Sequence, residues 1–194
     1  MPRSKTHNKE SLAKSAMELF WSKGYEATSM NDLVQATGVS RHGIYNDFGG
    51  KHSLFVAGFD IYQRCVVTPA FRRVESEGAG FNELTSYFEY QISQAESFGL
   101  PGPGCLVANT LTETTTHHKD VTNCISIHLQ KLKSGFENVL VNESCPSNEI
   151  NTLSELIVVF TQGLWSTSRV TDDADQLRRS VTTLLDLIKH RVQR

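Results

Sequence analysis

Residues 29–55 read SMNDLVQATGVSRHGIYNDFGGKHSLF, and this stretch decides how the chain is interpreted. Ser29 and Asp32 have the spacing of a capping box, in which each residue bonds the backbone N–H of the other. The box predicts a short helix over 30–37. Gly38 follows directly, and a glycine just past a helical pattern is a common C-terminal stop.

A second short helix is predicted immediately after the first. Ser40 is suited to cap a helix over 41–46, where Ile44 faces the core. Two short helices joined by a three-residue turn predict a helix-turn-helix, whose second helix enters the DNA major groove. The positions that then face outward are Arg41, His42 and Asn46.

Small and apolar residues predict the packing around this turn. We expect Ala36 and Gly38 to lie where the two helices approach each other, with Val39 filling the space beneath them. Phe48 is expected to help hold the second helix on the core.

The rest of the chain has apolar residues at helical spacing, and alternating strand-like stretches are scarce. One helix precedes the motif over 8–23, and another begins near Lys51 and continues through Tyr62. The later predicted helices cover 82–97, 105–114, 118–142, 149–168 and 174–192. The predicted fold is all-α, with an N-terminal three-helix head that carries the helix-turn-helix and an all-helical body. We place the boundary inside the fourth helix, so that the head is 1–52 and the body is 53–194.

Composition is that of an ordinary soluble globular protein, with 194 residues, 39% hydrophobic and 21% charged. The longest strongly apolar run, 156–160, is far shorter than the roughly 20 residues that a membrane helix needs. The N-terminus is polar and basic and lacks the apolar core of a signal peptide. We therefore expect a cytoplasmic protein with no membrane partner.

Charge is distributed unevenly along the chain. Residues 1–51 hold seven Lys or Arg against five Asp or Glu, whereas the remainder holds 12 basic and 16 acidic side chains. A basic head on an acidic body suits a polyanion at one end. The four cysteines are too far apart to form a CxxC pair, so we expect free thiols, no metal site and no cofactor.

The ordered pattern from Ala16 to Phe55 resembles the tetracycline-repressor (TetR) family of bacterial transcription factors. The residues that carry the resemblance are Ala16, Leu19, Phe20, Gly24, Tyr25, Thr28, Leu33, Val34, Ala36, Gly38, Val39, Ser40, Ile44, Tyr45, Phe48, Lys51, Leu54 and Phe55. The resemblance implies a DNA-binding head on an all-α ligand-binding body that dimerises through its last two long helices. It also implies a repressor in which a ligand in the body changes the separation of the two heads and releases DNA.

The resemblance assigns DNA contacts residue by residue. It places Tyr45 and Lys51 on phosphates, and Thr28 at the backbone near the start of the second helix. It places Arg41, His42 and Asn46 at or beside base edges, and the chemistry fits, since Arg pairs with guanine and Asn with adenine.

One position departs from the family pattern. Many members have His where this chain has Asp47, and a carboxylate is poorly suited to face a phosphate. We expect Asp47 to cap the following turn or to pair with a neighbouring cation. Gly43 is common in the family at its position, where a side chain could prevent close approach to the duplex.

The helices over 149–168 and 174–192 predict a homodimer, because an isolated chain would otherwise expose at least one broad apolar face. A two-fold dimer predicts a pseudo-palindromic double-stranded DNA operator. Its half-sites should lie about 34 to 36 Å apart, or further if the heads are splayed.

Cys105 is the candidate sensor of the body. The segment 103–109 resembles a Gly-Cys-Leu segment of some family members that respond to electrophiles or oxidants. In the first turn of a helix, unpaired N–H groups and the helix dipole would favour the thiolate and lower the pKa of Cys105. The alternative is a small inert hydrophobe packed beneath the loop.

A pocket for an unknown small-molecule effector is expected between the middle helices. The candidate lining residues are Tyr62, Phe88, Gln91, Asn109, His128 and Trp165, although aromatic residues at helical spacing are more often core. Cys65 is expected at a helix end in the core, and Cys145 is expected in a loop.

A second hypothesis is an all-helical enzyme or metal-binding protein that uses Cys105 or the Cys124/His128 pair. Cys124 and His128 are four residues apart on one predicted helix, with His117 or Asp120 within reach of the same face. The chain has no phosphate loop, GxSxG elbow or HExxH helix. We therefore expect no catalytic residues, and a regulator is the leading hypothesis.

Overall fold

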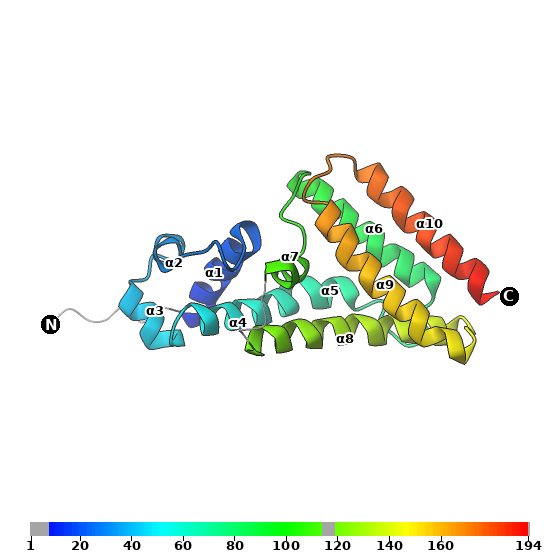
Figure 1. Cartoon of the computed structure of the whole chain (residues 1–194), viewed down its shortest axis with the longest axis horizontal. Helices are drawn as coiled ribbons and strands as arrows, with labels where there is room; N and C mark the ends of the chain where they lie inside the picture. Colours follow the sequence, from blue (N-terminus) through cyan, green and yellow to red (C-terminus); the bar gives the residue numbers. More distant parts are fainter. Residues whose placement is uncertain (1–7, 114–118, 194) are drawn as a thin grey trace.

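The computed structural model describes residues 8–113 and 119–193. Within these ranges the chain forms α-helices and one π-helical segment, and no strand, which confirms the predicted all-α class. The helices form two groups, with α1, α2 and α3 at the N-terminal end and α5 to α10 in the body (Figure 1). α4 runs from one group into the other.

The head consists of α1 (Lys9–Lys23), α2 (Met30–Thr37) and α3 (Arg41–Phe48). The predicted capping box is present, since the Ser29 N–H donates to Asp32 Oδ2 at 2.7 Å and the Asp32 N–H donates to Ser29 Oγ at 3.2 Å. Val39 and Ile44 are buried beneath the turn as expected. α3 extends two residues beyond the predicted end.

Two expectations about small residues are wrong. Ala36 is exposed, and a Cβ built on Gly38 would meet nothing within 4 Å, so the helices do not approach closely there. Gly38 has φ +67°, and this left-handed backbone conformation accounts for the glycine. Close contact occurs instead at Gly43, where a Cβ would lie 2.7 Å from Val39 Cγ1.

α4 (Lys51–Tyr62) belongs to both parts of the fold. Its Phe55 ring packs edge-on against Phe20 at 5.1 Å and Tyr25 at 4.9 Å between centroids, which completes the core of the head. The same helix contacts α8 in the body. The predicted division between residues 52 and 53 falls within this shared helix.

Sequence periodicity missed the continuation of α4 through η1 (Gln63–Val67) and α5 (Thr68–Phe71). η1 is a π-helical segment, in which the N–H of Thr68 donates to the carbonyl of Gln63. Pro69 has no N–H to donate to the carbonyl four residues earlier. This missing hydrogen bond favours a local change from α-helical to π-helical hydrogen bonding. Cys65 lies in η1 and is exposed, so its predicted place in the core is wrong.

The body consists of α6 (Phe81–Phe98), α7 (Leu106–Glu113), α8 (Lys119–Asn142), α9 (Ser147–Thr167) and α10 (Ala174–Val192), close to the predicted ranges. α8 packs on α9, and α10 packs on α6. Phe71 and Phe136 are fully buried at the centre of the body, with their rings edge-on at 5.5 Å.

The apolar stripes of α9 and α10 are not exposed in the single chain, contrary to the expectation from sequence. Ile157 is 0% and Leu177 1% exposed, because these stripes face α8 and α6. Other faces of the same helices carry exposed apolar side chains, namely Leu156, Val159 and Leu187.

Two further features follow from the sequence. The four cysteines are free thiols, as expected, and Cys145 lies in the loop between α8 and α9 but is buried. Among the described residues, no helix is both long enough and apolar enough to cross a membrane.

Candidate functional site

The first candidate site is the outer face of α3. Ser40 caps this helix by accepting the N–H of Gly43 at 3.1 Å. The four residues predicted on α3 to touch DNA, Arg41, His42, Tyr45 and Asn46, are all exposed. Arg41 Nη2 donates to Asn31 Oδ1 at 3.2 Å, which holds the guanidinium over the start of α2. The face therefore presents a cation, an imidazole, a phenol and an amide to one side of the head.

Tyr45 and Lys51 flank the sharp turn between α3 and α4. The Tyr45 ring lies against Gly50, where a Cβ would be 3.3 Å from Tyr45 Cε1, and Gly50 has φ +143°. Lys51 Nζ lies 4.4 Å from the Tyr25 ring centroid and donates to the Glu26 carbonyl at 3.5 Å. Partial burial lowers the pKa of Lys51, whereas nearby carboxylates, Glu26 first, oppose that effect. Two predicted phosphate contacts thus sit at one corner of the head.

Thr28 lies just before α2, as the sequence suggested, but it is buried. Its side chain is 1% exposed, and its hydroxyl donates to the Gly24 carbonyl at 2.5 Å. The residue closes the loop between α1 and α2. A phosphate cannot reach this hydroxyl in the present conformation, so we remove Thr28 from the proposed DNA contacts.

Asp47 is paired with a cation, as predicted. Lys9 Nζ lies 3.8 Å from Asp47 Oδ1 and also donates to the Asp47 carbonyl at 3.2 Å. The positive charge of Lys9 beside the carboxylate reduces the repulsion that a phosphate would meet.

The head of this chain matches a known family. Residues 12–57 match the family described as "Bacterial regulatory proteins, tetR family". The match covers the three helices of the head and the first part of α4. The matched stretch ends inside α4.

Other similar proteins match almost the whole chain. The HTH-type transcriptional repressor ComR of Escherichia coli (strain K12) is 27% identical over 191 residues, which are 95% of this chain and 90% of ComR. A TetR transcriptional regulator from Chloroflexus aurantiacus superimposes with a TM-score of 0.79 at 22% identity and covers 95% of both chains. The regulator CifR superimposes with a TM-score of 0.79 at 18% identity, over 95% of this chain and 98% of CifR. The likeness to the two solved structures shows the shared fold.

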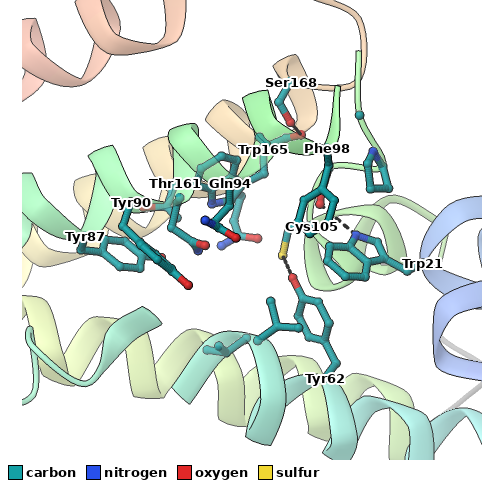
Figure 2. Close-up of a pocket in the computed structure, with 18 of the residues that line it drawn as sticks. Trp21, Tyr62, Tyr87, Tyr90, Gln94, Phe98, Cys105, Thr161, Trp165 and Ser168 are labelled. Atoms are coloured by element: carbon teal, nitrogen blue, oxygen red, sulfur yellow. Dashed lines mark hydrogen bonds between the residues drawn. The ribbon is translucent and has the colours of Figure 1, made fainter. Parts of the chain in front are cut away.

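The second candidate site is a cavity of about 270 Å³ inside the body (Figure 2). Five residues predicted for an effector pocket or sensor lie on its wall, namely Tyr62, Gln91, Cys105, His128 and Trp165. Side chains from α4, α6, α8 and α9 and from the loop before α7 meet there. Whether they contact an effector stays a prediction.

Two of the predicted pocket residues lie elsewhere. Phe88 is 0% exposed and packs edge-on against Phe160 at 6.2 Å, in the core behind the cavity. Asn109 is buried on α7, where its Nδ2 donates to the Pro103 carbonyl at 2.7 Å and to the Trp21 carbonyl at 3.4 Å. Asn109 therefore fastens the loop before α7 to the head and does not line the cavity.

Cys105 faces the cavity but is not a poised thiolate. Its Sγ accepts a hydrogen bond from the Tyr62 hydroxyl at 3.4 Å (Figure 2). Burial raises the pKa of the Cys105 thiol, although the Tyr62 hydroxyl and the N–H groups of Ala108 and Val107 act in the opposite direction. The expectation of a lowered pKa is wrong, because desolvation outweighs the helix N-terminus.

His128 is the only described residue on the cavity wall whose side chain ordinarily titrates near neutral pH. Burial, and to a smaller extent the nearby charge of Lys131, lower the pKa of His128 to about 4. Its Nδ1 lies 3.1 Å from Gln63 Oε1, which fits an N–H that donates to the amide oxygen. The imidazole is therefore neutral at pH 7.

The geometry does not favour a metal at Cys124 and His128. Asp120 Oδ2 lies 3.1 Å from His52 Nε2, and His117 is outside the described residues. Among the residues that the structure describes, no group of three His, Cys, Asp or Glu side chains could hold an ion.

Trp21 is a cavity residue that the sequence did not suggest. It belongs to α1 of the head, yet its indole lines the cavity and packs edge-on on Tyr62 at 5.0 Å. Its Nε1–H donates to the Gly104 carbonyl at 2.9 Å, one residue before Cys105. Helical periodicity gives no sign of this contact, because Trp21 meets the body over a sequence separation of 83 residues.

Proposed function

We propose that this chain is a homodimeric transcriptional repressor that binds a pseudo-palindromic operator through α3 and releases it when a small molecule enters the cavity. The observation that carries the proposal is Trp21, a residue of the DNA-binding head that forms part of the cavity wall. Two similar proteins support it: ComR is a transcriptional repressor, and CifR is known in complex with a 26-bp double-strand operator DNA. The protein would act by binding and not by catalysis, in the cytoplasm where the chromosome lies.

The proposed DNA contacts divide by role. Tyr45 and Lys51 hold phosphates and set the orientation of the head, while Arg41, His42 and Asn46 meet base edges. The exposure of Arg41, His42, Tyr45 and Asn46 on α3, with half-buried Lys51 at the start of α4, supports their role as DNA contacts.

The proposed dimer uses α9 and α10 through faces that the single chain leaves uncovered. Leu156 and Val159 on α9 and Leu187 on α10 are between 46% and 69% exposed. Gly163 continues this face of α9, and a Cβ built there would meet nothing within 4 Å, so a partner helix could approach closely. Two such helices from each protomer would form a four-helix interface.

Coupling between the sites follows from the connections of Trp21 and Asn109. An effector that displaces the Trp21 indole would disturb the hydrogen bond from the indole N–H to the Gly104 carbonyl. Movement of the loop before α7 would also reach α1, because the Asn109 amide donates to the Trp21 carbonyl. Because α1 packs along α4, a shift of α1 alters the placement of the whole head. An effector releases DNA only if it binds the released arrangement more tightly than the DNA-bound one.

A thiol-reactive effector is a second candidate, favoured by the position of Cys105 Sγ on the cavity wall. A buried neutral thiol reacts slowly, so the compound must enter the cavity before it reacts. N-ethylmaleimide should weaken DNA binding by the wild type and not by Cys105→Ser. Cys65→Ser is the matched control, because this exposed cysteine also lines the cavity. An equal response of wild type and Cys105→Ser would remove the candidate.

DNA binding itself is tested by fluorescence anisotropy with duplexes selected from a random pool, measured over a range of salt concentrations. Lys51→Ala should weaken binding to selected and random duplexes alike and reduce the salt slope by about one. Arg41→Ala should lower affinity for the selected duplex about tenfold and leave random duplexes nearly unchanged. Arg72→Ala removes one exposed cation in the body and serves as the charge-matched control. If Arg41→Ala lost affinity equally for selected and random duplexes, the proposed contact of Arg41 with a base would be refuted.

A further inference from the structure

We propose that the effector is an uncharged aromatic compound whose hydrogen-bonding group pairs with the side-chain amide of Gln162. This inference rests on the proposed function, since it names the class of molecule that the cavity takes. It is built from the charge, the shape and the unused polar atoms of the cavity wall.

The cavity wall carries no formal charge at neutral pH. Among the described residues that line it there is no Asp, Glu, Lys or Arg, and the imidazole of His128 is neutral because burial lowers its pKa to about 4. An ionic ligand would lose its hydration and find no opposite charge in return. The cavity therefore selects neutral molecules.

Aromatic rings make up much of the wall and favour a flat ligand. The rings are those of Trp21, Tyr62, Tyr87, Tyr90, Phe98 and Trp165 (Figure 2). They come from α1, α4, α6 and α9 and so surround the space from several sides. Aromatic side chains bind a planar ring by offset stacking or edge-to-face contact. Phe98 is 77% exposed while it also lines the cavity, which places it at the mouth.

Gln162 supplies the polar anchor. Its Oε1 and Nε2 atoms are both buried, and neither has a hydrogen-bond partner among the described residues. Two neighbouring hydroxyls on the wall are already engaged: the Thr161 hydroxyl donates to the Ile157 carbonyl, and the Ser168 hydroxyl donates to the Trp165 carbonyl. A buried amide without a partner is costly, so a ligand that satisfies it gains affinity.

The chemistry of the amide defines the complementary group. A glutamine side chain accepts through Oε1 and donates through Nε2 in one plane. A neutral group with an adjacent donor and acceptor, such as a carboxamide or lactam, satisfies both atoms at once. A carboxylate offers only acceptors and an amidinium only donors, and each also brings a charge.

Three probes of similar shape separate these possibilities: 4-butylbenzamide, 4-butylbenzoate and 4-butylbenzamidinium. Both tryptophans of the chain, Trp21 and Trp165, line the cavity, so tryptophan fluorescence reports binding directly. We expect 4-butylbenzamide to bind and the two ions to bind at least about 100-fold more weakly. Ions that bind as tightly as the amide, or no fluorescence change with any probe up to its solubility limit, would overturn the proposal.

A pair of variants tests the role of Gln162. Gln162→Met keeps the length of the side chain and removes its hydrogen-bonding atoms, so affinity for 4-butylbenzamide should fall about tenfold. Affinity for butylbenzene, which has no polar group, should not fall in this variant. Gln130→Met, an exposed position on α8, is the matched control and should change neither affinity. Equal amide affinity in wild type and Gln162→Met would refute the anchor.

Repression is measured separately, by anisotropy of a selected duplex with and without 4-butylbenzamide. If the probe binds with the expected dependence on Gln162 but the protein holds DNA as before, the ligand class stands and the proposed release of DNA fails. If the ligand class fails while the duplex is still bound specifically, the DNA-binding part of the proposed function stands.

Discussion

Buried His128 makes the stability of this protein depend on pH in a way that can be calculated. The imidazole is 4% exposed, and burial lowers its pKa from 6.5 to about 4. In the unfolded chain His128 binds a proton below pH 6.5, whereas in the folded chain it stays neutral until about pH 4. Between these values the unfolded state binds more protons, so stability falls as pH falls.

The size of the effect follows from the shift of the pKa. A difference of one in pKa between the folded and unfolded states corresponds to about 1.4 kcal/mol. The free energy of unfolding therefore falls by about 3 kcal/mol in total once the pH is below 4. At pH 5 the loss is about 2 kcal/mol relative to pH 7 or above. Above pH 7 the contribution vanishes, because the imidazole is neutral in both states.

The assay is urea unfolding followed by circular dichroism at pH 7 and pH 5, at fixed protein concentration. His128→Asn cannot titrate but keeps an N–H that can donate to Gln63 Oε1. Between pH 7 and pH 5 the free energy of unfolding of the wild type should fall by about 2 kcal/mol more than that of His128→Asn. His190→Asn, at an exposed position on α10, is the control and should follow the wild type. If wild type and His128→Asn lose the same free energy, His128 titrates normally and the cavity is not the neutral environment described here.

Three further predictions concern packing, assembly and coupling. Gly135→Ala would place a Cβ 2.5 Å from the buried Phe71 ring, so the free energy of unfolding in urea should fall by about 1 to 3 kcal/mol. An unchanged unfolding midpoint would contradict the packing of α8 on α5. Val159→Glu puts a charge on the exposed face of α9 and should shift sedimentation from dimer to monomer, whereas a dimer that persists would exclude this face. Trp21→Phe keeps an aromatic ring but removes the N–H that donates to the Gly104 carbonyl. The variant should still bind DNA, but the effector should release less of it. Full release of DNA by the effector would show that the two sites are coupled through other residues.

The head could be predicted from sequence because its determinants are local. The capping box at Ser29, the left-handed Gly38 and the cap at Ser40 act within four residues, and each is present in the structure. The pairing of Asp47 with a cation was also expected, although the sequence could not say that Lys9 supplies it. Burial of the Thr28 hydroxyl could not be predicted, since it depends on the path of the loop after α1.

The cavity depends on tertiary packing, which helical spacing does not resolve. Tyr87 lines the cavity and the adjacent Phe88 does not. Successive residues of α6 point in different directions, so Tyr87 faces the cavity and Phe88 is buried in the core. The apolar stripes of α9 and α10 were correctly located, but periodicity could not tell packing within one chain from packing between two. The raised pKa of Cys105 likewise depends on burial by distant segments, which outweighs the local effect of the helix N-terminus.

Selection of bound duplexes from a random DNA pool shows whether α3 reads a pseudo-palindromic operator. The selection should be repeated with Tyr45→Ala and with Arg41→Ala. We expect an enriched inverted repeat with the wild type, no enrichment with Tyr45→Ala, and loss of preference at particular base pairs with Arg41→Ala. A wild-type selection that enriches no inverted repeat, or one that Tyr45→Ala reproduces unchanged, would contradict this expectation.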